Sequence, residues 1–166
     1  MNKILIQSVI HQRPVYQQSG RWFVLDEEFK WDLPTLQKDV FACLNKAFHI
    51  PIIFCDSCEA NKIVSALGEE EAEYLHFASG VYWREVGIIF IFKFDDYLPL
   101  IETIFHELRH YIQDYIPYYQ KEFELDKKRP YEERTTEQDA FAFAAYYLAK
   151  FTRQNSHAIP SQEAIS

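Results

Sequence analysis

The chain is short of glycine and of positive charge. Four glycines and seven prolines among 166 residues exclude a collagen-like or low-complexity protein. Seventeen lysines and arginines stand against 25 aspartates and glutamates, which gives a net charge of −8. Proteins that bind nucleic-acid backbones need a basic surface. We therefore expect no nucleic acid among the main partners.

Long hydrophobic runs are also missing. The longest apolar run, Val86–Phe92, is far too short to cross a bilayer. Polar residues interrupt the apolar stretch at the N-terminus before a secretory signal could form. Without such a signal, we expect the three cysteines, Cys43, Cys55 and Cys58, to stay reduced. These features predict a cytoplasmic protein with no membrane contact.

Apolar residues are plentiful overall. They make up 48% of the chain, and aromatic residues alone make up 17%, which is enough material for a buried core. The length suits one domain. We expect this domain to cover residues 1–151. The remainder, residues 152–166, is expected to be a polar C-terminal tail because it has no packing pattern.

Apolar periodicity and turn residues predict the order of the elements. Strands are expected at Ile4–Ile10, Trp22–Leu25, Ile50–Phe54, Val81–Arg84 and Ile88–Phe94, the last two as a hairpin around Glu85–Gly87. Helices are expected at Leu33–Phe48, Glu59–Leu67, Tyr97–Tyr115 and Glu137–Phe151. Strands come mostly first and two long helices come last, which favours an α+β fold.

The first of these two long helices carries His106-Glu107-x-x-His110, in which two imidazoles four residues apart can face one metal ion. Asp96 is expected to cap this helix, and Pro99 fits its first turn. Both histidines lie opposite an apolar stripe. The stripe contains Ile101, Ile104, Phe105, Leu108, Ile112 and Tyr115. The alternative is a solvated helix face that carries these residues without a metal.

A catalytic zinc ion needs three protein ligands and one open position. A nearby third histidine, as in metzincins, is excluded because Gln113 and Ile116 occupy the positions where that pattern has glycine and histidine. A carboxylate on the last helix is the other source. Glu137 begins an apolar stripe with Ala140 and Ala144, whose small side chains would let another helix approach closely. A buried carboxylate needs a cation, which is either an arginine or a metal.

Two other acids compete with Glu137 for the third ligand position. Asp139 projects from nearly the opposite side of the helix and fits a capping box with Thr136. Glu133 lies one turn before Glu137. We favour Glu137, with Asp139 and Glu133 as the alternatives.

The segment His106-Glu-Leu-Arg-His110, followed 27 positions later by Glu137-x-Asp-Ala140 and Phe143-Ala-Ala145, resembles the ImmA/IrrE-type metallopeptidases, small zincins of the gluzincin kind. The resemblance covers about residues 88–150. It implies a zincin-like domain whose mixed or antiparallel sheet packs on a metal-binding helix and a C-terminal helix. Arg109 and Phe141 replace the small residue and the Asn or Asp usual in that family, so the wider gluzincin-like group is the better assignment.

Members of that group hydrolyse peptide bonds in protein substrates, often regulatory proteins. By this resemblance, we expect His106, His110 and Glu137 to bind one zinc ion per chain. Glu107 is the expected general base, which accepts a proton from the attacking water and passes it to the leaving amine. An extended protein or peptide substrate is expected along an edge strand, Val81–Arg84 rather than Ile88–Phe94.

Supporting roles are open to several residues. Glu102 or Asp114, each one turn from a metal-binding histidine, could orient an imidazole. Tyr131 or His157 could steady an oxyanion. His11, His49 and His76 have no ligand spacing and are expected to be ordinary histidines.

Two other classes of function remain. One is a non-catalytic zincin-like metal-binding domain with a regulatory or interaction role, which is disfavoured because Glu107 serves chemistry and adds little to metal binding. The other is a thiol–disulfide protein that uses Cys55 and Cys58. We expect instead that these cysteines are two ordinary thiols.

Overall fold

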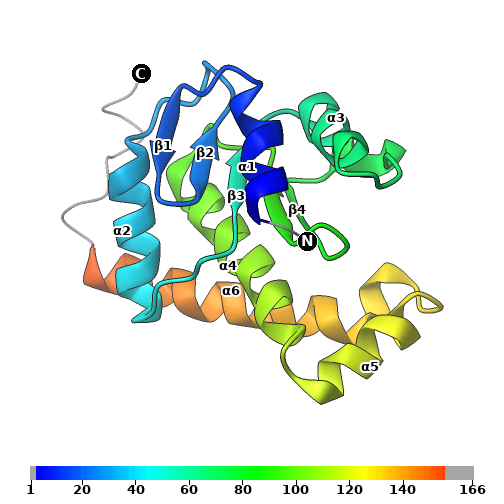
Figure 1. The fold of residues 1–166 in the computed structure, drawn as a ribbon. Helices are drawn as coiled ribbons and strands as arrows, with labels where there is room; N and C mark the ends of the chain where they lie inside the picture. The colour runs from blue at the N-terminus through cyan, green and yellow to red at the C-terminus, as the bar shows by residue number, and fades with distance from the viewer. Residues whose placement is uncertain (1–2, 156–166) are drawn as a thin grey trace.

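A mixed sheet lies between two layers of helices (Figure 1). The computed structural model describes residues 3–155, and within them five short strands follow the order β1-β2-β3-β5-β4. The strands are β1 Gln17–Ser19, β2 Trp22–Val24, β3 Ile52–Phe54, β4 Gly80–Trp83 and β5 Ile88–Ile91. The three central strands are parallel, and β1 and β4 pair antiparallel at the two edges. The predicted α+β class is confirmed.

Successive side chains of each central strand point to opposite faces of the sheet and so pack into two different cores. In β3, Ile52 and Phe54 face one core, whereas Ile53 faces the other. The first core is covered by α2 Leu33–Leu44, α4 Tyr97–Gln113 and α6 Thr135–Gln154. The second is covered by α1 Lys3–His11 and α3 Ser57–Ala66. Burial on both faces explains why the central strands are continuous apolar runs.

Side-chain caps start the two helices that follow β2 and β3. Asp32 accepts a hydrogen bond from the backbone N–H of Thr35 at 3.1 Å and so begins α2. Asn45, in the left-handed conformation with φ 53°, ends α2 earlier than predicted. Asp56 accepts a bond from the backbone N–H of Glu59 at 2.7 Å and begins α3.

The hairpin of β4 and β5 brings an edge strand onto α4. It was predicted, as was the edge position of β4. Gly80 begins β4 where there is no room for a side chain: an added Cβ would lie 3.0 Å from both the Thr103 side chain of α4 and the backbone oxygen of Phe90. The absence of a side chain at Gly80 therefore allows β4 to lie directly against α4.

Helix α4 follows its prediction closely. Ile101, Ile104, Phe105 and Leu108 are completely buried, as the apolar stripe predicts. Tyr115 is 71% exposed because the helix ends before it. Asp96 occupies the predicted N-cap position, although its side chain makes no cap hydrogen bond.

Two segments that were not expected to be helical form helices. The predicted strand Ile4–Ile10 is helix α1, in which Ile6, Val9 and Ile10 are buried at helical spacing and Leu5 is 45% exposed. Helix α5, Pro117–Asp126, was not predicted, because Pro117 was interpreted only as the end of α4. Proline is equally suited to the first turn of a new helix, and it has that role here.

A residue of α5 caps α6. The Asp126 carboxylate accepts hydrogen bonds from the backbone N–H groups of Thr135 and Thr136 at 3.0 and 2.9 Å, and from the Thr136 hydroxyl at 2.6 Å. The predicted capping box between Thr136 and Asp139 is therefore wrong, since Asp139 bonds to side chains of α4 instead. This cap fixes the first turn of α6, which contains Glu137.

Helix α6 continues past its predicted end at Phe151 to Gln154, so the first residues of the expected polar tail are helical. The rest of that tail, residues 156–166, lies outside the described part of the chain. Among the helices of residues 3–155, none combines the length and the apolar character that a membrane crossing needs.

Candidate metal centre

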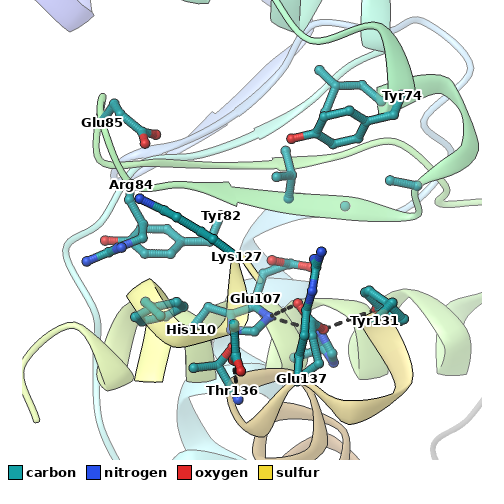
Figure 2. A pocket seen from close by; sticks show the side chains of 18 residues that line it. Tyr74, Tyr82, Arg84, Glu85, Glu107, His110, Lys127, Tyr131, Thr136 and Glu137 are labelled. Atoms are coloured by element: carbon teal, nitrogen blue, oxygen red, sulfur yellow. Dashed lines mark hydrogen bonds and ion pairs between the residues drawn. The ribbon is translucent and has the colours of Figure 1, made fainter. Parts of the chain in front are cut away.

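A cleft of about 600 Å³ lies between edge strand β4 and helices α4, α5 and α6. Figure 2 shows Glu107, His110 and Glu137 on the helical side of this cleft, and Tyr82 and Arg84 on the side of β4. The residues predicted to carry the chemistry therefore line one concave site, which is the usual form of a small-molecule or peptide site.

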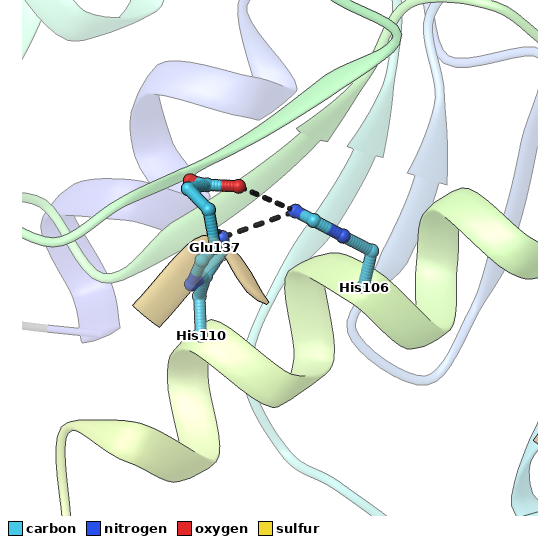
Figure 3. A group of neighbouring side chains, drawn as sticks. All are labelled: His106, His110 and Glu137. Atoms are coloured by element: carbon cyan, nitrogen blue, oxygen red, sulfur yellow. Dashed lines mark hydrogen bonds and ion pairs between the residues drawn. The ribbon is translucent and has the colours of Figure 1, made fainter. Parts of the chain in front are cut away.

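Three residues with potential ligand atoms converge in this cleft (Figure 3). His106 Nε2 lies 3.0 Å from Glu137 Oε2, His110 Nε2 lies 3.1 Å from Glu137 Oε1, and the two Nε2 atoms lie 3.2 Å apart. The structure thus brings together the three predicted ligands. Neither alternative carboxylate, Asp139 or Glu133, belongs to this group.

Two helices supply the three ligands. His106 and His110 lie one turn apart on α4 and project from the same face. Glu137 comes from the first turn of α6. Ala140 and Ala144 on α6 are buried, with 0% and 1% exposure, and their small side chains permit the close approach of the two helices that was predicted.

The spacing of the three groups is close to that of a tetrahedral zinc site. Ligand atoms at roughly 2.0–2.1 Å from a tetrahedral ion lie about 3.3–3.4 Å from one another. The two imidazole nitrogens lie 3.2 Å apart, and they lie 3.0 and 3.1 Å from different oxygens of Glu137, so small side-chain shifts reach that spacing. Two imidazoles and one carboxylate also form a ligand set that zinc accepts.

The Glu137 carboxylate is paired with the two histidines. Within residues 3–155, no lysine or arginine lies at ion-pair distance from it, so the arginine alternative is not met. Burial by itself raises the pKa of Glu137, but the hydrogen bonds and charges of His106 and His110 outweigh it and hold the pKa well below its usual range. The carboxylate is therefore charged and favours a cation beside it.

The pKa of His110 shows the same attraction between imidazole and carboxylate. Burial lowers the pKa of its imidazole, yet the hydrogen bond to Glu137 and the charges of Glu107 and Glu137 raise it to about 9. The metal-free cluster thus binds a proton strongly. A divalent ion at the same place would replace that proton, because metal binding needs the imidazole in its neutral form.

Glu107 lies beside the cluster and is only 6% exposed. Burial raises the pKa of its carboxyl group, while the nearby His110 and His106 lower it to a smaller extent. The backbone of Tyr82 on β4 lies close enough to this carboxyl group to lower its pKa slightly as well. Glu107 therefore lies between the helix and the edge strand, with a basicity above that of an exposed carboxylate.

Gln113 orients the imidazole of His110, whereas the sequence predicts Glu102 or Asp114 for this role. Its Oε1 lies 2.9 Å from His110 Nδ1, and its Nε2 donates to Thr136 O at 2.9 Å and to Asp139 at 2.8 Å. Because both amide hydrogens are used, Oε1 accepts a bond from Nδ1–H, so in the neutral imidazole the lone pair of Nε2 is directed at the cluster. The position of Gln113 one turn after His110 was a signal that could have identified it.

The predicted orienting residues serve elsewhere. Asp114 accepts hydrogen bonds from the Tyr82 hydroxyl and from Arg84, and Glu102 makes no described bond to an imidazole. Asp139 instead accepts bonds from Arg109 Nε at 2.6 Å and from Gln113, so it supports α4 from α6. Arg109, which departs from the resembled family, thus has a structural partner.

Tyr131, one of the two expected oxyanion donors, lies at the cleft. Its hydroxyl donates to Glu137 Oε2 at 3.1 Å, and its ring lines the cleft (Figure 2). Burial, together with the charge of Glu137, raises the pKa of Tyr131, so the hydroxyl keeps its proton at neutral pH. The other candidate, His157, lies outside the described residues.

Phe141, the other residue that departs from the resembled family, packs edge-on against His106 with ring centres 4.5 Å apart.

The cysteines have the features of ordinary thiols. All three are free, Cys55 is buried and Cys58 is exposed. Burial raises the pKa of Cys55 well above its usual value, and the charges of Asp56 and Glu59 add to the effect. A reactive thiol needs the opposite shift. The thiol–disulfide interpretation is therefore disfavoured.

The described fold and site define a small α+β domain that presents a His–His–Glu cluster in a cleft. The chain belongs to the family described as "Protein of unknown function (DUF3920)", whose model matches residues 24–155. No curated protein and no solved structure matches the chain. The matched region contains the cluster, the cleft and most of the sheet.

Proposed function

We propose that the protein is a zinc-dependent metallopeptidase that hydrolyses a peptide bond in a protein or peptide substrate. One observation carries the proposal: His106 Nε2, His110 Nε2 and the Glu137 carboxylate approach one another to 3.0–3.2 Å in a cleft that also holds Glu107. Structural zinc sites use four protein ligands, whereas catalytic sites use three and keep one position open. A three-ligand set beside a general base favours catalysis.

His106, His110 and Glu137 would hold one zinc ion per chain. When bound, zinc supplies a Lewis acid that polarises a substrate carbonyl and makes water a better nucleophile near neutral pH. Gln113 prepares the site for the ion, because it fixes the tautomer in which His110 presents the Nε2 lone pair.

Glu107 is the proposed general base. Burial raises its pKa and makes the carboxylate more basic, and the residue lines the cleft beside His106 and His110. Glu107 accepts a proton from the attacking water and delivers it to the leaving amine. Hydrolysis thus consumes one water and forms one carboxylate and one amine. The Tyr131 hydroxyl, which keeps its proton, is the proposed donor to the carbonyl oxygen as negative charge develops there.

Edge strand β4 supports a substrate in extended conformation. It lies at the end of the sheet and forms one wall of the cleft, so a peptide can add to it by backbone hydrogen bonds. The resemblance to ImmA/IrrE-type enzymes favours a regulatory protein as the natural substrate. We place the activity in the cytoplasm, where free thiols such as those of the three cysteines persist.

Comparison of the zinc-loaded wild type with Glu107→Gln tests this proposal. The substitution keeps shape and polarity but removes the basic oxygen, so cleavage of a source-cell proteome should fall by roughly 10²–10⁴-fold. Zinc content should stay at one ion per chain. Glu28→Gln, in an exposed loop, is the matched control and should cleave like the wild type.

Equal behaviour of wild type and Glu107→Gln, with zinc bound to both, would favour a non-catalytic zincin-like domain with a regulatory or interaction role. Loss of zinc from Glu107→Gln would assign that residue to metal binding instead. His106→Ala separates these outcomes, because it should lose both zinc and cleavage.

A further inference from the structure

The candidate metal centre lies where two arms of the cleft meet. Gly80, His106, Glu107 and Tyr131 line both arms. The first arm, of about 600 Å³ including the centre, is called the cationic arm and contains Arg84, Lys127 and Arg134. The second, of about 390 Å³, is called the apolar arm and contains Phe77, Pro99, Phe141 and Ala144. A ligand that spans the centre therefore meets different chemistry on its two sides.

Positive charge in the cationic arm is incompletely neutralised. Among the residues that the structure describes, no carboxylate forms an ion pair with Arg134, whose guanidinium lies over the Tyr131 ring. Lys127 pairs only with Glu124, and this pair is largely exposed and screened by water. Arg84, by contrast, is neutralised by Asp114. Lys127 is visible beside the centre in Figure 2.

Two carboxylates in the lining of the cationic arm reduce its positive charge. Glu85 is exposed on the wall of the cationic arm, across from Lys127 (Figure 2). Asp126 also lines the arm, but it is buried and bonded to Arg129 and Thr136. Apart from the metal centre, the lining of the cationic arm therefore holds three cations and two carboxylates, an excess of one positive charge in a chain with a net charge of −8.

The apolar arm carries exposed aromatic rings. Phe77 is 79% exposed and Phe141 is 52% exposed, although large rings are usually buried. The only charged residue of its lining away from the metal centre is Glu102, which would repel an acidic side chain. An apolar side chain of a ligand would cover these rings and remove them from water.

Strand β4 connects the two arms. Gly80 lines both, and the strand lies at the free edge of the sheet. A peptide extended along β4 would pass the metal centre with residues before and after it in different arms. Charge complementarity then favours an acidic side chain in one arm, and apolar contact favours an aromatic side chain in the other.

We propose that the cleft selects extended peptides that carry an acidic side chain on one side of the metal centre and a large apolar side chain on the other. This inference rests on the proposed peptidase function, whose substrate class it specifies. Lys127 and Arg134 select the acidic residue, and Phe77 and Phe141 select the apolar one.

Short synthetic peptides test the inference with zinc-loaded full-length protein. The set carries Glu or Lys on one side of a central bond and Phe or Ser on the other, in both orders, with control peptides that place Glu and Phe on the same side. We expect one order of the Glu/Phe pair to be cleaved with a kcat/KM about tenfold or more above that of the Lys/Phe and Glu/Ser peptides.

Charge-reversal variants identify the residues responsible. Lys127→Glu/Arg134→Glu should reverse the preference from the Glu to the Lys peptide, and Lys127→Glu alone, at an exposed position, should reduce it. Lys128→Glu makes the same change of net charge at an exposed position outside the lining and should leave the preference unchanged. Phe77→Ser should reduce only the preference for Phe.

The result also separates this inference from the peptidase proposal. Cleavage without preference for the Glu/Phe pair, or a preference that survives charge reversal, overturns the inference alone. Fluorescence anisotropy with labelled peptides of the same set covers the case without cleavage: selective binding of the Glu/Phe peptide then supports the inference and contradicts the peptidase. Absence of both cleavage and selective binding overturns both.

Discussion

Gln113 Oε1 accepts a hydrogen bond from His110 Nδ1 at 2.9 Å and thereby fixes the imidazole that faces Glu137. The amide group of Gln113 is itself held by the Thr136 carbonyl and by Asp139. Helix α6 thus contributes to the candidate centre twice, with Glu137 directly and with its first turn through Gln113. Metal affinity should depend on this support as well as on the three ligands.

Replacing Gln113 with leucine should weaken zinc binding by roughly 10–100-fold, because His110 loses the acceptor that fixes its tautomer. Titration of metal-stripped protein with zinc against a competing chelator measures the change. Gln138→Leu, at an exposed position of α6, is the matched control and should leave the affinity unaltered. Equal affinities of Gln113→Leu and wild type would refute the orienting role.

Glu137→Ala and Asp139→Ala should have different consequences. The first removes a proposed ligand and should abolish stoichiometric zinc binding. The second breaks the pair with Arg109 and should mainly lower the free energy of unfolding, by about 1–3 kcal/mol, since it leaves a partly buried hydrogen-bonding group without its partner. Denaturant unfolding and metal analysis of both variants measure the contrast. Loss of zinc only from Asp139→Ala would reverse our ligand assignment.

Asp126 should make stability depend on pH in the acidic range. Burial raises the pKa of its carboxyl group, but hydrogen bonds from Thr136, Thr135 and Arg129 outweigh it and lower the pKa below the usual value. The charged form is thus favoured by folding, so this stabilisation is complete above the ordinary pKa of about 4 and is lost as pH falls through the lower pKa of the folded state.

Substitution of Asp126 by alanine measures this contribution. The free energy of unfolding at pH 7 should fall by about 1.5–3 kcal/mol, the usual value of hydrogen bonds to a charged group. The difference from wild type should shrink as the pH drops below about 4, where the wild-type carboxylate becomes protonated. A difference that stays constant from pH 7 to pH 2 would contradict the assignment.

Gly80→Ala should destabilise the protein by about 1–3 kcal/mol, because the new Cβ would lie 3.0 Å from both the Thr103 side chain and a backbone oxygen. Thr103→Ser removes the methyl group involved while its hydroxyl can still bond to Pro99 O. The double variant should therefore recover part of the loss in thermal unfolding. An unchanged melting temperature for Gly80→Ala would show that β4 can move away from α4.

The grouping of the three potential ligands could be predicted because each depends on local periodicity. His106 and His110 share a helix face by their spacing, and Glu137 lies on the same stripe as two buried alanines. The edge position of β4 followed in the same way from the contrast between a short strand and an apolar interior strand. Such patterns report on one element at a time.

The contacts that hold Gln113 and Arg109 could not be predicted, because they join residues distant in sequence. The bond from Gln113 to Asp139 spans 26 positions, and the choice of Asp139 as a partner of Arg109 rather than as a cap depends on how α4 and α6 pack. The segment Ile4–Ile10 predicts a strand as readily as helix α1, because its five apolar residues among seven satisfy either period. The apolar residues of α1 pack against α3 and β5 at helical spacing, a contact that the sequence alone does not reveal.

The most direct test of the account is X-ray absorption at the zinc edge of protein loaded with one equivalent of zinc, together with metal analysis of His106→Ala, His110→Ala and Glu137→Ala. We predict one zinc ion with two imidazole nitrogens and further oxygen ligands at roughly 2.0–2.1 Å, no sulfur, and loss of stoichiometric metal in every variant. Sulfur ligation, or stoichiometric zinc that survives these substitutions, would contradict the His–His–Glu centre on which the proposed function depends.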